Sequence, residues 1–112
     1  MAIISSQGGS IQWRLTQNPT GHDYGHHMSK AAANMAGMLL SQELKASGVS
    51  VSILHPGFNR TDMTSKYQAI WEVEGAVDPS IGAKRVIHEI NRMTMESTGS
   101  FINCEDGLTI PW

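Results

Sequence analysis

Residues 49–57 have the sequence VSVSILHPG, and this stretch decides the fold class. A short run of β-branched and apolar residues bounded by turn residues is typical of a buried strand. Pro56 cannot donate a hydrogen bond to a neighbouring strand, and Gly57 frees the backbone for a turn. We therefore predict a buried strand that ends at His55 and continues into a loop.

A helical pattern precedes this strand, from about His26 to Ser47. Gly48 stands where the glycine that follows a helix is expected. Many residues of the helix are alanine or glycine, which lets its backbone approach a sheet and another helix closely. The predicted packed face has a spacing of three to four positions and consists of Met28, Ala31, Ala32, Met35, Met38, Leu39 and Ala46.

The first residues predict a second buried strand at Ala2-Ile3-Ile4, which is too short for a helix and ends at Ser5-Ser6. Residues 7–25, with Gly8, Gly9 and Pro19, are predicted to form a long structured loop. Chains usually begin with an exposed segment, so a core-type strand directly after the first residue suggests that a preceding part of the domain is missing.

Three more elements are predicted downstream: a short helix at 61–71, a helix at 78–93 and a strand at 99–104, followed by an apolar tail. Asp78 is a helix N-cap residue and Pro79 suits the first helical turn. The predicted buried row of that helix is Ala83, Val86, Ile87 and Ile90. The order β-α-β-α-β predicts an α/β fold with a Rossmann-like parallel sheet, incomplete at three strands.

The amino-acid composition excludes several classes of function. The chain has 112 residues, with 8 Lys and Arg against 10 Asp and Glu, and no basic run. This charge excludes the electrostatic footprint of a nucleic-acid or acidic-membrane binder. Cys104 is alone, which excludes an internal disulfide framework and suits a cytoplasmic protein. No stretch has the length or apolar character of a membrane span or a signal peptide.

Three segments carry residues suited to chemistry. They are Ser5-Ser6 with the glycines that follow, residues 26–30 at the start of the long helix, and residues 55–61 after the central strand. All three leave, or lie close to, the carboxyl ends of predicted parallel strands. Ligands bind at that edge in open α/β sheets, so we expect these segments to form one site.

The ordered motifs Ser6-Gln7-Gly8-Gly9, Ser29-Lys30 and Pro56 to Thr61 resemble the C-terminal half of a short-chain dehydrogenase/reductase, in particular the carbonyl-reductase-like members. In that family a strand ends in Ser-Ser-x-x-Gly, a helix begins Tyr-x-x-x-Lys, and a later strand ends in Pro-Gly-x-x-x-Thr. The resemblance implies NAD(P)-dependent redox chemistry between a small carbonyl compound and an alcohol.

The resemblance also implies roles for individual residues. Ser6 polarises the substrate carbonyl, Lys30 holds the cofactor ribose and tunes the acid, and the cofactor contacts Lys30 together with Pro56, Gly57 and Thr61. The family's tyrosine position, four residues before Lys30, holds His26. Tyr24 lies six residues before the lysine and faces away on a helix. We therefore expect turnover to be reduced or absent.

The family's glycine-rich nucleotide-binding turn does not occur in this sequence. Residues 1–112 are therefore predicted to be a single partial domain, the catalytic half, with the N-terminal nucleotide-binding half absent. Weak or no NAD(P) binding is expected from this chain alone. The alternative is a non-catalytic half or pseudoenzyme that acts through self-association. In either case we predict a homo-oligomer, with the alanine-rich helix or the first strand at the interface.

Several of these residues also have simpler, purely structural interpretations. Ser6 is also an ordinary residue for a loop, and Thr61 is also a plain helix cap. His22 and His26 have a spacing that zinc sites use, but Gly21 and Gly25 disfavour a helix there and no further ligands complete a set, so no metal is expected. Tyr67 and Trp71 either line a substrate pocket or cover the core.

Overall fold

A parallel three-stranded sheet lies at the centre of the computed structural model, which describes residues 1–112. Its strands are β1 (Ala2–Ile4), β2 (Ser52–His55) and β3 (Ser100–Asn103), in the order β1-β2-β3. Ile3 pairs with Ile53, and Ile53 pairs with Phe101. The α/β class and the positions of the three strands are confirmed.

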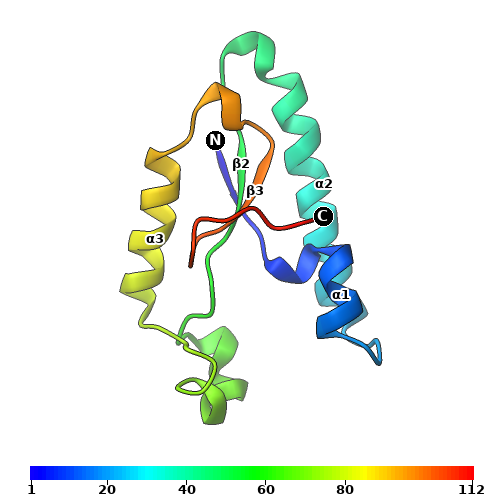
Figure 1. The fold of residues 1–112 in the computed structure, drawn as a ribbon, viewed down its shortest axis with the longest axis vertical. Coiled ribbons are helices and arrows are strands. Elements are labelled where there is room, and N and C mark those ends of the chain that lie inside the picture. The colour runs from blue at the N-terminus through cyan, green and yellow to red at the C-terminus, as the bar shows by residue number, and fades with distance from the viewer.

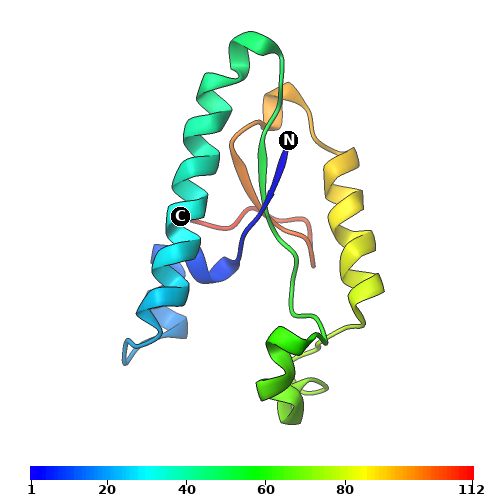
Figure 2. The ribbon, with the colours of Figure 1, turned by 180° about the vertical axis from the view of Figure 1, so that it is seen from behind.

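Helices flank the sheet. Figures 1 and 2 show the sheet between the long helix α2 (Tyr24–Glu43) and α3 (Pro79–Asn91), with the short helix α1 (Ile11–Gln17) beside the start of α2. Four short 3₁₀ segments complete the fold: η1 (Gln7–Gly9), η2 (Lys45–Ser47), η3 (Asp62–Ile70) and η4 (Met95–Ser97). No helix of the structure has both the length and the apolar character needed to cross a membrane.

The core is small and centres on β2. Val51, Ile53 and Leu54 are fully buried, as the β-branched run predicts. Ile53 packs with Phe101 and Ile110, and Trp13 of α1 covers this cluster. The C-terminal tail runs back along β3 through an antiparallel bridge between Ile102 and Thr109. The apolar tail therefore closes the core on the side of α1.

The prediction of a loop throughout residues 7–25 is wrong, because this segment contains η1 and α1. Ser10 caps α1, since its hydroxyl oxygen accepts a hydrogen bond from the Trp13 N–H at 3.2 Å. The C-terminal tail also holds this helix start, because the Ile11 N–H donates to the carbonyl of Trp112. A contact with the last residue of the chain cannot be predicted from local sequence.

The packed face of α2 also differs from the prediction. Met28, Met35 and Leu39 are exposed by 66%, 63% and 56%. A Cβ added at Gly37 would lie 2.5 Å from Cγ1 of Ile53, so the helix approaches the sheet too closely for large side chains. The residues that α2 buries are instead Asn34, Gly37 and Ser41.

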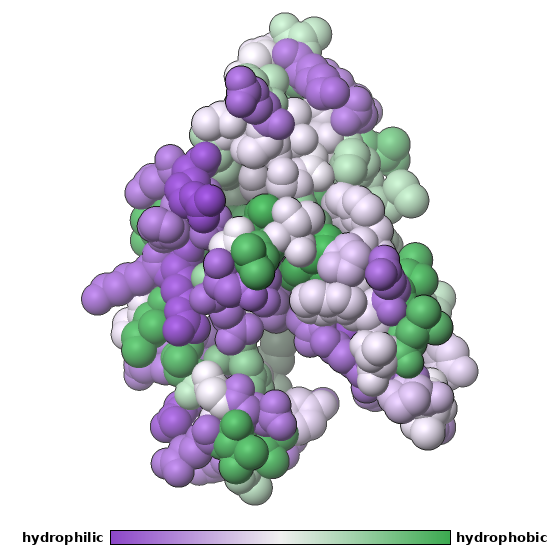
Figure 3. Space-filling model, in the orientation of Figure 1, coloured by the Kyte–Doolittle hydropathy of each residue, from purple (hydrophilic) through white to green (hydrophobic).

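The predicted buried row of α3 is largely uncovered. Ile87 is 56% exposed and Ile90 is 40% exposed, whereas Gly82 and Glu89 are the residues that α3 buries. In Figure 3 a small hydrophobic patch lies among hydrophilic atoms on the side of α3, and further hydrophobic atoms lie on the flank of α2. Ile4 is likewise half exposed, because β1 is an edge strand that pairs only with β2. Ala2 and Ile3 are only partly buried, so the expectation that β1 is a buried strand is wrong.

The remaining predicted boundaries agree closely with the structure. Asp78 caps α3, where its carboxylate accepts from the Ser80 N–H at 2.9 Å, and Pro79 is the first helical residue. Gly48 has a φ of 69°, as the end of the helical region requires. The short helix after Thr61 is present, although it is a 3₁₀ helix.

Candidate active site

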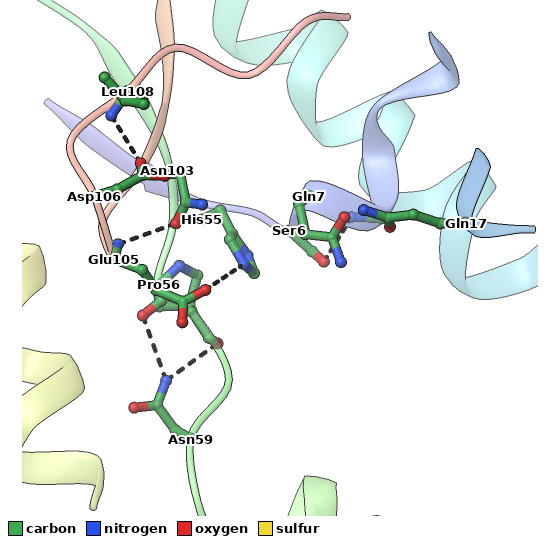
Figure 4. Close-up of polar contacts among 12 residues, drawn as sticks. Ser6, Gln7, Gln17, His55, Pro56, Asn59, Asn103, Glu105, Asp106 and Leu108 are labelled. Carbon is green, nitrogen blue, oxygen red and sulfur yellow. Dashed lines mark hydrogen bonds and ion pairs between the residues drawn. The ribbon is translucent and has the colours of Figure 1, made fainter. Parts of the chain in front are cut away.

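The carboxyl ends of the three strands bring the predicted segments to one edge of the sheet (Figure 4). Ser5 and Ser6 follow β1, and His55 ends the neighbouring strand β2. The Ser5 N–H donates to the carbonyl of Leu54 at 2.8 Å, which fixes the end of β1 beside the end of β2. The side chain of Glu105, from the loop after β3, lies against the end of β2.

Gly8 lies at the centre of the side chains predicted to be catalytic. Its N–H donates to Oγ of Ser6 at 3.0 Å. A Cβ added at Gly8 would lie 3.0 Å from Nε2 of His26 and 3.2 Å from Oγ of Ser6. These two polar atoms therefore converge on one point, although they come from η1 and α2. Burial of Gly8 leaves no room there for a larger residue.

Lys30 lies one helical turn after His26, and η1 packs directly on its backbone. A Cβ at Gly9 would lie 2.7 Å from the carbonyl carbon of Lys30 and 2.6 Å from Nδ2 of Asn34. Ser5 reinforces this contact, since its hydroxyl donates to Oδ1 of the buried Asn34 at 2.6 Å. The structure thus brings Ser6, His26 and Lys30 into one neighbourhood through close backbone packing.

His26 has a pKa that is shifted by its surroundings. Partial burial, followed by the charges of His27 and Lys30, lowers the pKa of His26 below its ordinary value, while Asp23 acts in the opposite direction. His26 is therefore mostly neutral at pH 7. A neutral imidazole can still donate one hydrogen bond. Tyr24 begins α2 and is 73% exposed, so it does not occupy the acid position.

The turn after β2 holds Pro56, Gly57 and Thr61 and is shaped by Asn59 (Figure 4). The Asn59 amide donates to the carbonyls of Gly57 at 3.2 Å and Pro56 at 3.5 Å. Gly57 has a φ of 94°, which favours glycine at this position. The Thr61 N–H donates to Oγ1 of Thr64 at 3.0 Å, so Thr61 also begins η3.

A groove of about 360 Å³ runs beside this turn, between it and α3. Pro56, Asn59 and Thr61 line one wall, and Ile4 with α3 residues Ala83 and Ile87 lines the other. Oδ1 of Asn59 is buried at the groove without a hydrogen-bond partner. The sequence has no glycine-rich turn for a pyrophosphate beside this groove.

His55 is a buried histidine at the same edge. Burial lowers the pKa of His55 to about 4, and the charge of Asp106 acts in the opposite direction. Its Nε2 lies 3.7 Å from Oε1 of Glu105. The Glu105 side chain also covers Gly57, because a Cβ there would lie 2.6 Å from Glu105 Cγ. Since His55 is neutral at pH 7, this pair is a packing contact with no charge attraction.

Three contributors to the site were not predicted: His27, Asn59 and Glu105. His27 adjoins the predicted His26, and Asn59 lies inside the predicted turn, so the motif positions could have pointed to both. No feature of the sequence near Glu105 predicted its place in the site, because only the parallel sheet brings the ends of β2 and β3 together.

The structure contains no group of three or more His, Cys, Asp or Glu side chains placed to hold a metal. Trp71 donates from Nε1 to the carbonyl of Thr64 at 3.1 Å, within its own segment.

Comparison with curated proteins gives two relatives over the whole chain. The 1-hydroxy-2-glutathionyl-2-methyl-3-butene dehydrogenase of Rhodococcus sp. (strain AD45) is 35% identical over 112 residues, which are 46% of its length. The C-signal protein of Myxococcus xanthus is also 35% identical over 112 residues, 60% of its length. The chain thus spans about half the length of the curated relatives it matches. No family model matches the sequence.

Solved structures agree with these relatives. NADPH-bound carbonyl reductase from chicken fatty liver superposes with a TM-score of 0.80 at 28% identity, over 99% of this chain and 42% of that protein. The carbonyl reductase Sniffer of D. melanogaster has a TM-score of 0.78 at 31% identity, over 99% of this chain and 41% of its own.

Fold and comparisons together define the class as an α/β domain with a Rossmann-like parallel sheet. Within that class, the resemblance to the short-chain dehydrogenase/reductase family is confirmed. The chain has the sequence and fold of part of such a protein, of the carbonyl-reductase type.

Proposed function

We propose that this chain is the C-terminal, catalytic half of an NAD(P)-dependent oxidoreductase that interconverts a small carbonyl compound and an alcohol. The observation that carries this proposal is the convergence of Ser6 Oγ and His26 Nε2 on Gly8. Lys30 follows one turn later on the same helix. The free, buried thiol of Cys104 suits a reducing compartment, so we place the protein in the cytoplasm.

The hydroxyl of Ser6 is oriented for hydrogen bonding to a carbonyl oxygen. Its oxygen accepts from the Gly8 N–H, which leaves its own proton free to be donated. His26 would give a proton to the same oxygen from its imidazolium form, and the positive charge of Lys30 favours the neutral imidazole that remains. We therefore assign a serine hydroxyl, an imidazole and an ammonium group to one reacting carbonyl.

The nicotinamide coenzyme would supply hydride when bound. Pro56, Gly57 and Thr61 at the groove, with Lys30, would hold its nicotinamide and ribose end. No part of the chain offers a glycine-rich turn for the pyrophosphate. We therefore expect binding of NADH or NADPH no tighter than about millimolar, roughly −4 kcal/mol. Micromolar binding in a calorimetric titration would contradict this expectation.

Replacement of the residue at the acid position tests the proposal. The chain is joined to a nucleotide-binding half from a carbonyl reductase, and NADPH oxidation is followed with a small aldehyde or ketone. We expect His26→Tyr to raise the rate at least about 100-fold, because a phenol beside an ammonium is the family's acid. Ser6→Ala in the His26→Tyr background should remove that gain. Equal rates for His26 and Tyr at pH 7 would contradict the assigned role.

Uncovered apolar surface favours a second candidate, a non-catalytic half that acts through self-association. Met35 and Leu39 form an exposed row along α2, and β1 has a free edge. A symmetric dimer would bury either surface twice. We expect sedimentation velocity at low micromolar concentration to give a homodimer or larger species, which Leu39→Lys dissociates. A compact monomer at that concentration would exclude this candidate.

A further inference from the structure

His27 makes a hydrogen bond that joins the start of α2 to η1. Its Nδ1 lies 2.8 Å from the carbonyl oxygen of Gly8, nineteen residues earlier in the chain. A carbonyl oxygen only accepts hydrogen bonds, so Nδ1 of His27 must carry the hydrogen. The contact therefore fixes the tautomer of His27 as well as the distance between the two segments.

Gly8 connects His27 to Ser6 through two hydrogen bonds. Its carbonyl accepts from His27, while its N–H donates to Oγ of Ser6 at 3.0 Å. Gly8 is buried, and a Cβ there would lie 3.0 Å from Nδ1 of His27 and 3.2 Å from Oγ of Ser6. A displacement of Gly8 must therefore also displace the serine hydroxyl.

We propose that His27 is a positioning residue for Ser6 and acts through the main chain of Gly8. The importance of Ser6 in this statement rests on the function proposed above. Ser5 and Gly9 fix the neighbouring residues of this segment to Asn34 and Lys30, but neither of them bonds to the carbonyl of Gly8. His27 holds the carbonyl of Gly8, the residue whose N–H bonds to the serine hydroxyl.

His27 also faces His26 at 5.2 Å between ring centroids, with the rings at 69°. The other charged groups around His26 are Lys30 and Asp23 on and beside α2, and Arg14 from α1. A protonated His27 still donates from Nδ1, so its hydrogen bond persists while its charge opposes protonation of His26. Substitution of His27 by a neutral residue should therefore raise the midpoint at which His26 titrates.

The tautomer provides a test that needs no variant. ¹⁵N NMR of the histidine rings in the full chain, at an alkaline pH where the rings are neutral, should show the hydrogen of His27 on Nδ1 and an unprotonated Nε2. The opposite tautomer would overturn the proposal. This result does not depend on cofactor binding or turnover, so it stands apart from the proposed oxidoreductase function.

Two variants separate the hydrogen bond from the charge. His27→Asn keeps a side-chain N–H near the position of Nδ1 without a titratable charge, whereas His27→Leu removes both. We expect amide exchange at Gly8 to stay within about twofold of the wild type in His27→Asn and to quicken roughly fivefold in His27→Leu, the scale of one hydrogen bond. Both variants should raise the His26 midpoint.

His88→Leu, on α3, serves as the matched control and should change neither measurement. Wild-type exchange at Gly8 in His27→Leu would overturn the proposal, as would an unchanged His26 midpoint in both variants. If His27→Leu does not fold, the wild-type tautomer and the exchange rate in His27→Asn decide the outcome in the same way.

Discussion

The two long helices contact the rest of the molecule very differently. Helix α2 approaches β2 at Gly37 so closely that a Cβ would lie 2.5 Å from Ile53. On the same helix, η1 packs against the backbone of Lys30. Helix α3 lies on the other side and leaves Ile87 and Ile90 uncovered.

This difference divides the candidate site into two parts. The part with Ser6, His26 and Lys30 belongs to the α2 side, where glycines and buried hydrogen bonds fix the backbone. The turn with Pro56 and Thr61 lies against α3, whose apolar row has no cover within this chain. The α2 side is thus fixed by its own close packing, whereas the α3 side keeps apolar surface that this chain leaves uncovered.

The largest expected difference in unfolding free energy is between an isoleucine-to-alanine substitution under α2 and the same substitution on α3. Ile53→Ala should lower the free energy of unfolding by about 4 kcal/mol, because Ile53 is fully buried under α2. Ile87→Ala on α3 should change it by less than about 0.5 kcal/mol, since the side chain is mostly exposed. Urea denaturation of both variants measures this. A comparable loss in the two would mean that α3 is packed as firmly as α2.

Glycine substitutions sharpen the comparison within the α2 side. Gly9→Ala should cost about 3 kcal/mol of unfolding free energy, because the added methyl would press on the backbone of Lys30. Gly25→Ala, near the start of α2, meets no atom within 4 Å and should be neutral or stabilise by up to about 1 kcal/mol through helix propensity. Thermal unfolding distinguishes the two. A tolerated Gly9→Ala would refute close packing of η1 on α2.

A further effect on stability should depend on pH through His55. Its pKa is about 4 in the folded state and about 6.5 when unfolded, so the unfolded chain binds the extra proton between those values. Stability contributed by this group is therefore complete well above pH 6.5 and is lost as the pH falls toward 4, by about 3 kcal/mol. His55→Gln should remove this component of the pH dependence. Unfolding measured at pH 7 and pH 4 gives the difference, and parallel curves for both proteins would show that His55 is not buried as a neutral group.

The local sequence determined those strands and helix ends that depend only on neighbouring residues. The β-branched run ending at His55-Pro56-Gly57 specifies β2, and Asp78-Pro79 specifies the start of α3. The motifs around Ser6 and Lys30 can also be recognised from the sequence, because they are defined by residue type, spacing and order along the chain. These features need only neighbouring residues, so propensity and capping suffice to predict them.

Tertiary structure decided which faces pack and which side chains meet. The apolar spacing of α2 predicted a buried Met35, yet the close approach at Gly37 selects the small and polar face for the sheet. The helix α1 depends on a cap completed by Trp112, and Glu105 reaches Gly57 only because β2 and β3 are parallel neighbours. Such contacts join residues far apart in the chain. Their energies depend on distances between backbones, which periodicity along the sequence does not encode.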